Sequence, residues 1–102
     1  MKGNTTIVVL HEHAAVIELI EAALRDRGLL VLGTLDAFEA AEIVRRVKVD
    51  LLVLSRSHRE LAENLRALQS GLPAVVLDGE PMWLDEIVDA VVAALPPRCE
   101  RS

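Results

Sequence analysis

Four short apolar runs alternate with four segments of helical periodicity, and this alternation limits the folds open to the chain more than any other feature. The runs cover residues 6–10, 29–33, 51–54 and 73–77. Each is too short for a typical helix and nearly continuous in Val, Leu and Ile, which is typical of strands buried on both faces. Strands that alternate with helices form parallel sheets, because the crossover between two parallel strands is long and right-handed. The sequence therefore predicts an α/β domain in which helices cover both faces of a four-stranded parallel sheet.

Local signals mark the ends of the first two helices. Apolar residues recur at helical spacing over residues 16–24, and Gly28 stands where a glycine ends many helices. Asp36, followed three residues later by Glu39, resembles a capping box. This signal predicts Asp36 as the N-cap of a helix that extends to about residue 47.

The second half of the chain carries the same kinds of signal. Ser57 and Glu60 predict another helix N-terminus, with Ser57 as the N-cap. The last helix is expected over residues 82–95, where two prolines end it. Residues 1–95 are expected to form one domain and residues 96–102 a disordered tail. The single cysteine, Cys99, has no internal disulfide partner, so only a disulfide between chains is open to it.

Charge and composition exclude several classes of partner. The 102 residues carry a net charge of -5, with Lys and Arg scattered along the chain, which argues against a nucleic-acid surface. No apolar run approaches the roughly 18 residues of a membrane helix, and the first run is too short for the core of a signal peptide. We therefore expect a cytoplasmic protein with an aliphatic core and no membrane partner.

Taken together, the segments resemble the receiver domain of response regulators in two-component signalling. The stretch "VVLHEHAAVIELIEAALRDRGLLVLGTLDAFEAAEIV" is similar to the first strand, first helix, second strand and start of the second helix of a receiver. "DLLVLS" resembles the third strand, "PAVVLD" the fourth, and "EPMWLDEIVDAVVAAL" the end of the domain. The resemblance implies a three-layer, flavodoxin-like sheet in the order 2-1-3-4 with four helices, lacking the usual fourth helix and fifth strand.

The resemblance also implies a phosphoacceptor pocket, at the carboxyl ends of the strands, that has become degenerate. The corresponding positions in this chain are His11, Glu12, Ser55, Asp78 and Glu80. His11 and Glu12 stand at the paired acids, and Ser55 at the phosphoacceptor aspartate. Asp78 occupies the position where receivers have a hydroxyl-bearing residue, and Glu80 occupies the position of their lysine. One carboxylate is left to hold a cation, and a serine hydroxyl is a weak nucleophile without an activating base. We therefore expect no phosphorylation, no cofactor and no catalytic residue.

Two other interpretations use some of the same residues. The "HEH" segment at 11–13, together with Asp78, could bind zinc, although structural zinc sites have a fuller ligand set. We favour the simpler interpretation, in which this segment is a polar loop that caps the first helix. Ser55, His58 and Asp78 are the residue types of a hydrolase triad, but the glycines of the turn that exposes such a serine are absent. A small ligand- or metal-binding regulatory domain is thus the alternative function.

A receiver-like domain that is not phosphorylated is expected to act by binding proteins. The resemblance implies a pseudo-receiver in bacterial signalling, which is an interaction module rather than an enzyme. The last helix is apolar over about twice the roughly 100° arc that packing on one side requires, and the fourth strand is left as a sheet edge. These features predict a partner or homodimer surface at Trp83, Ile87, Val88, Val91 and Ala94. In the alternative, the helix covers the bare edge within one chain.

Overall fold

The structure, a computed structural model, describes residues 5–69, 71–77 and 84–95. Its centre is a parallel sheet with the strand order β2-β1-β3-β4. The strands are β1 (Thr6–Leu10), β2 (Leu30–Thr34), β3 (Leu51–Ser55) and β4 (Ala74–Leu77). The predicted four-stranded sheet and its order are therefore confirmed.

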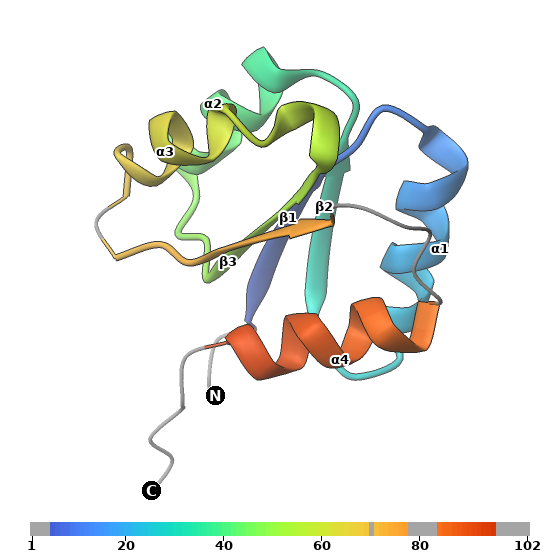
Figure 1. Ribbon diagram of the computed structural model, residues 1–102. Helices are drawn as coiled ribbons and strands as arrows, with labels where there is room; N and C mark the ends of the chain where they lie inside the picture. Colours follow the sequence, from blue (N-terminus) through green and yellow to red (C-terminus); the bar gives the residue numbers. More distant parts are fainter. Residues whose placement is uncertain (1–4, 70, 78–83, 96–102) are drawn as a thin grey trace, which may run out of the picture.

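Helices cover the two faces of this sheet in separate layers. They are α1 (Ala14–Arg25), α2 (Ala37–Arg46), α3 (Leu61–Arg66) and α4 (Leu84–Ala94), and a 3-10 turn, η1 (Arg56–His58), follows β3. α1 and α4 pack on one face, and α2 and α3 on the other (Figure 1). This is the predicted three-layer α/β arrangement. The first residues of the expected last helix and the expected tail lie outside the described residues.

The central strands supply side chains to both layers, which explains their continuous apolar sequences. Every residue of β1 and β3 is buried. Ile7 and Val9 belong to the cluster beneath α1 and α4, whereas Val8 and Leu10 belong to the cluster beneath α2 and α3. Because successive side chains of a strand point to opposite faces, a strand with helices on both sides places nearly every side chain in a core, and polar residues occur in β1 and β3 only at an end, as Thr6 and Ser55.

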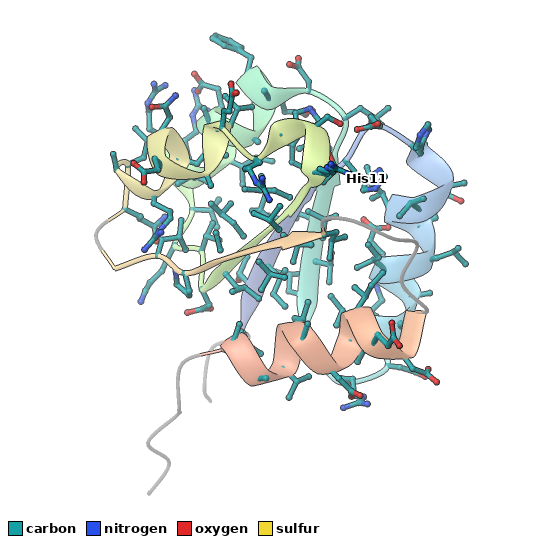
Figure 2. The ribbon with its side chains drawn as sticks, viewed as in Figure 1. His11 is labelled. Atoms are coloured by element: carbon teal, nitrogen blue, oxygen red, sulfur yellow. The ribbon has the colours of Figure 1, made fainter. Side chains whose placement is uncertain are left out.

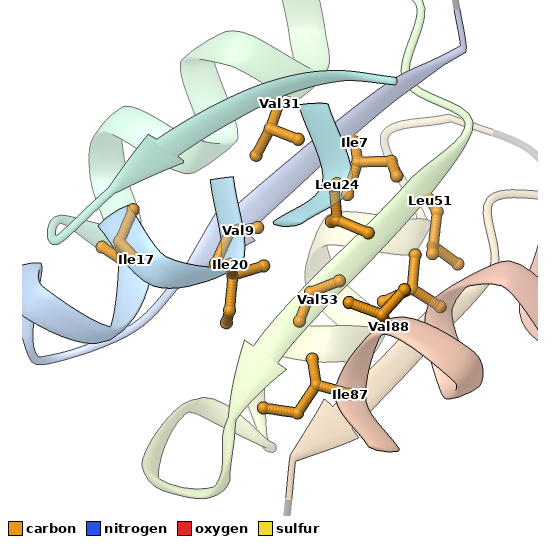
Figure 3. Close-up of a cluster of buried hydrophobic side chains, with 11 residues drawn as sticks. Ile7, Val9, Ile17, Ile20, Leu24, Val31, Leu51, Val53, Ile87 and Val88 are labelled. Atoms are coloured by element: carbon orange, nitrogen blue, oxygen red, sulfur yellow. The ribbon is translucent and has the colours of Figure 1, made fainter. Parts of the chain in front are cut away.

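The inner face of α4 is part of the core of the single chain. Ile87 and Val88 are 7% and 6% exposed, and Val91 is 0% exposed. Figure 3 shows Ile87 and Val88 directed toward Val53 of β3. These three residues were expected at a partner surface, but here they cover the sheet of their own chain. A partner surface on α4 would have to use its other side, where Val92 is 42% exposed.

The ends of the first two helices refine the sequence prediction. Gly28 has φ +80, the left-handed conformation expected of a glycine after a helix. The N–H of Leu29 donates to the carbonyl of Leu24 at 3.2 Å, so Leu29 closes the end of α1 and β2 starts one residue later than predicted. Asp36 is the N-cap of α2 as predicted, because its carboxylate accepts from the N–H of Phe38 at 2.9 Å.

The capping box itself forms only in part. Glu39 does not bond the N–H of Asp36; its Oε1 accepts from the Thr34 hydroxyl at 2.6 Å. The N–H of Asp36 instead donates to Oγ1 of Thr34 at 3.1 Å. The last residue of β2 thus replaces the glutamate as the acceptor, because it lies directly before the turn.

Candidate functional site

The candidate site lies where β1 and β3 end side by side. Leu10 pairs with Leu54 in the parallel register, so the residues that follow each strand leave the sheet at the same edge. Figure 2 shows His11 at this edge, between the end of β1 and the start of α1. His11, Glu12 and Ser55 are therefore brought together as the sequence predicts. Asp78 and Glu80 lie outside the described residues.

A hydrogen-bond network around Glu12 connects the two strand ends. Ser55 donates its hydroxyl proton to Oε1 of Glu12 at 3.2 Å, and the Ser57 hydroxyl donates to the same oxygen. The two serines are 43 and 45 residues away from Glu12 in the sequence. The network therefore joins the β1–α1 loop to the turn after β3.

The role of Ser57 differs from the prediction. The helix α3 begins only at Leu61, with Glu60 in the N-cap position and no capping bond from a side chain. Because η1 carries the chain from β3 into a helical turn, Glu60 is already helical, with φ -68 and ψ -19. Ser57 is thus placed four residues before the helix, and its hydroxyl binds the carboxylate of Glu12 instead of a backbone N–H.

His58 completes the surroundings of the Ser55 hydroxyl. Its Nδ1 lies 2.9 Å from Oγ of Ser55. A serine hydroxyl carries a single proton, so while that proton is donated to Glu12, His58 Nδ1 must carry the hydrogen and act as the donor. In this tautomer the histidine cannot accept the serine proton, which the base of a hydrolase triad must do. Ser55 is also only 3% exposed.

Sequence reasoning named His58 only as a triad residue type and did not predict this contact. The signal that could have identified it is the spacing of Ser55 and His58, because side chains three residues apart lie on the same side of a helical turn.

The β1–α1 loop caps the first helix through the ring of His11. The N–H of His13, the N-cap residue of α1, donates to Nδ1 of His11 at 3.1 Å. The side chain of His13 makes no capping bond; its Nε2 lies 3.9 Å from Oε2 of Glu12. The interpretation of this segment as a polar cap is therefore supported, but the acceptor is His11 rather than Glu12 or His13.

The electrostatics of the loop favour neutral His11 and charged Glu12. Partial burial lowers the pKa of His11 from 6.5; Glu12 opposes this shift, and the neighbouring rings of His13 and His58 add to it. The hydrogen bond from Ser57 lowers the pKa of Glu12 from 4.5; desolvation opposes this, and the bond from Ser55 adds to it. A neutral His11 is the form that can accept the N–H of His13.

We expect the free energy of unfolding to decrease as the pH falls below 6.5. Because the pKa of His11 is lower in the folded chain, the unfolded chain binds more protons between that lowered value and 6.5. The contribution of His11 is thus complete above pH 6.5 and is lost as the pH falls toward the folded pKa. Glu12 acts in the same direction, but only below 4.5. Urea unfolding gives the free energy of unfolding at each pH. Measurements above pH 6.5, and between pH 4.5 and 6.5, isolate the contribution of His11.

The control for this pH dependence is His11→Asn, which keeps a side-chain acceptor near the His13 N–H but does not titrate. This variant should lose part of the decrease in stability between neutral pH and pH 5. If the variant and the wild type have the same pH dependence, the assignment to His11 is wrong.

The zinc alternative gains no geometric support from the described part of the chain. Within residues 5–69, 71–77 and 84–95, no group of three or more His, Cys, Asp and Glu side chains is arranged to hold a metal ion.

In the same ranges, no helix is both long enough and apolar enough to cross a membrane.

Comparison with solved structures identifies the fold. The receiver domain of the hybrid histidine kinase CckA superposes with a TM-score of 0.77 at 21% identity, over 89% of this chain and 99% of that one. A response regulator from Thermotoga maritima gives a TM-score of 0.68 at 19% identity, over 90% and 98% of the two chains. A response regulator receiver protein from Pseudomonas putida gives 0.68 at 22% identity, over 93% and 84%.

The chain therefore has the fold of a response-regulator receiver domain, as its sequence predicts. No protein-family model matches the chain, and no curated protein sequence matches it. At these identities the comparison defines the fold, and the function has to be argued from the site.

Proposed function

We propose that this chain is a phosphorylation-independent, receiver-like domain that acts by binding proteins and that associates with itself. The observation that carries the proposal is the state of the Ser55 hydroxyl at the end of β3. It is buried and hydrogen-bonded to Glu12 and His58. By the resemblance to receivers, this position would hold the phosphoacceptor carboxylate. Burial closes the access of this hydroxyl to a phosphoryl donor, and the lowered pKa of Glu12 makes that carboxylate a weak base for removing the serine proton.

The network around Glu12 supports the same conclusion for the cation. Mg²⁺ takes oxygen ligands in near-octahedral geometry and is usually held by one or two carboxylates. Here one carboxylate oxygen of Glu12 already accepts from Ser55 and Ser57. A cation at this edge would have to use the other oxygen of Glu12 or replace those hydrogen bonds, with His11 rather than an acid beside it. We infer that the network connects β1 and β3 in place of a bound cation.

The free lateral edge of the sheet, formed by β4, supports self-association. All four residues of β4 are apolar and half-buried, and no strand of the described chain pairs with its outer side. The neighbouring α4 contacts β4 and carries the exposed Val92 and the half-buried Ala94. An edge strand with unpaired backbone groups can add a strand of a second copy. Trp83, the other residue expected at this surface, is outside the described residues.

One experiment tests both parts of the proposal. The protein is incubated with acetyl phosphate and Mg²⁺, and its intact mass and sedimentation velocity are measured over a range of protein concentrations. We expect no added phosphoryl group and the same concentration-dependent association with and without the treatment. A stable phosphoryl adduct would contradict phosphorylation independence. A monomer at every concentration would contradict self-association.

A further inference from the structure

A groove of about 330 Å³ lies at the carboxyl end of β2. β2 and β4 are the two edge strands, so the groove and β4 are at opposite lateral edges of the sheet. It runs between the first turns of α1 and the loop that leads from β2 into α2. No residue of the network around Glu12 lines it. The groove is therefore separate both from the candidate site and from the edge proposed for self-association.

The floor of the groove is apolar and includes a side chain that the fold leaves in contact with water. Gly33 has no side chain, and Ile17 of α1 packs directly over it. Leu35, which lines the groove, is 54% exposed. A large aliphatic side chain left exposed in a concave surface with an apolar floor is a candidate contact for a partner.

The charges around this floor are all negative. Glu18 of α1 and Asp36 and Glu39 of α2 line the groove, and no Lys, Arg or His does.

Two of these carboxylates are partly engaged within the chain. Asp36 accepts from the N–H of Phe38, and Glu39 accepts from the hydroxyl of Thr34. A carboxylate has about four lone-pair sites, so both can accept further donors. The positive end of the α2 dipole offsets part of the charge of Asp36 and of Glu39, which lie at the start of that helix, so the charge of Glu18 on α1 is the one that this dipole leaves unreduced.

We propose that this groove binds a cationic segment of a partner protein, in which one bulky apolar side chain is flanked by Lys or Arg. The apolar side chain would cover Leu35 and Ile17, and the cations would lie against Glu18 and Glu39. A second copy of this chain fits poorly, because its net charge of -5 has the same sign as the groove. The phosphates of nucleic acids and anionic lipids are excluded for the same reason.

This inference rests on the proposed function in one respect: it names the class of partner for an interaction domain. Because the groove and β4 lie at opposite edges of the sheet, a partner segment and a second copy could bind at the same time. Binding at the groove does not depend on whether Ser55 accepts phosphate.

The test uses a fluorescein-labelled heptapeptide, Lys-Arg-Leu-Trp-Leu-Arg-Lys, and a twin in which Glu replaces each basic residue. Changes in the NMR chemical shifts of backbone amides show which residues the peptide contacts, and fluorescence anisotropy gives the Kd. We expect the basic peptide to shift the amides of residues 14–18 and 33–39, and the acidic twin to leave them unchanged. Raising the salt concentration should weaken binding, because exposed charges are screened over about 10 Å at 0.1 M salt.

Two pairs of variants show whether the groove is responsible. Leu35→Asp should weaken binding of the basic peptide about tenfold or more, whereas Leu68→Asp, at a leucine that is 37% exposed and outside the groove, should not. Glu18→Lys should weaken it about fivefold, whereas Glu63→Lys on the exposed side of α3 should not. Circular dichroism establishes that each variant is folded.

The inference is overturned if the basic peptide leaves the groove amides unshifted, if the acidic twin binds equally well, or if Leu35→Asp and Leu68→Asp weaken binding equally. Its failure can be separated from that of the proposed function. If the peptide does not bind and sedimentation is as expected, only the proposal for the groove is contradicted. If a phosphoryl adduct forms and the peptide still binds, phosphorylation independence is contradicted and the proposal for the groove stands.

Discussion

Replacing Val91 with Asp is expected to unfold the domain. Val91 is 0% exposed and lies in the cluster between α1, α4 and the sheet. An uncompensated buried charge costs about 3–5 kcal/mol, and the burial of the valine side chain is lost as well. This sum is comparable to the roughly 5–15 kcal/mol that stabilises a whole domain. Thermal and urea unfolding, followed by circular dichroism, measure the effect.

The matched control is Val92→Asp, the same substitution at the next position, where the side chain is 42% exposed. Its effect on stability should stay within about 0.5 kcal/mol, as for most surface substitutions. If α4 takes part in self-association, Val92→Asp should also weaken association in sedimentation velocity. If Val91→Asp unfolds like the wild type and only dissociates the protein, Val91 belongs to an interface and the core assignment is wrong.

Gly33→Ala is expected to destabilise the domain by about 1–3 kcal/mol, the usual cost of overpacking. A Cβ on Gly33 would overlap Cγ2 of Ile17. Ile17 is 7% exposed, and its branched side chain is stiff at χ1, so it cannot turn aside. The strand and α1 would have to separate locally. Equilibrium urea unfolding gives the free energy.

A double-mutant cycle isolates this contact. Ile17→Ala removes Cγ2, so adding Gly33→Ala to that variant should cost at least about 1 kcal/mol less than it does in the wild type. Ile17→Val keeps both γ-carbons and should give no such relief. If the cost of Gly33→Ala is the same beside isoleucine, valine and alanine, the close packing of α1 on β2 is not its cause.

Much of the fold could be predicted because its signals are local. The apolar runs of β1 and β3 identify strands buried on both faces, and Gly28 and Asp36 mark helix ends through their own backbone and side-chain chemistry. The boundaries shifted where a neighbour competed. Leu29 closes α1 instead of opening β2, and Thr34 takes the acceptor role that the capping pattern assigns to Glu39.

For the candidate site, the sequence predicted which described residues would meet, but not how they would bond. The resemblance to receivers brings His11, Glu12 and Ser55 to one edge of the sheet, and the structure agrees. It does not indicate that Ser57 would leave its expected capping role for Glu12, or that His58 would turn toward Ser55. These contacts depend on the turn η1 after β3, and no pattern in the surrounding residues predicts that turn.

The sequence by itself determined that this is a parallel α/β domain whose third strand ends in a serine rather than a carboxylate, because strand identity, helix periodicity and side-chain chemistry are properties of neighbouring residues. Only the tertiary structure decided which side of α4 is core, which carboxylate holds the Ser55 hydroxyl, and where an acidic groove opens beside β2. Each of these depends on side chains that are far apart in the chain, and their contacts are set by how the helices pack on the sheet.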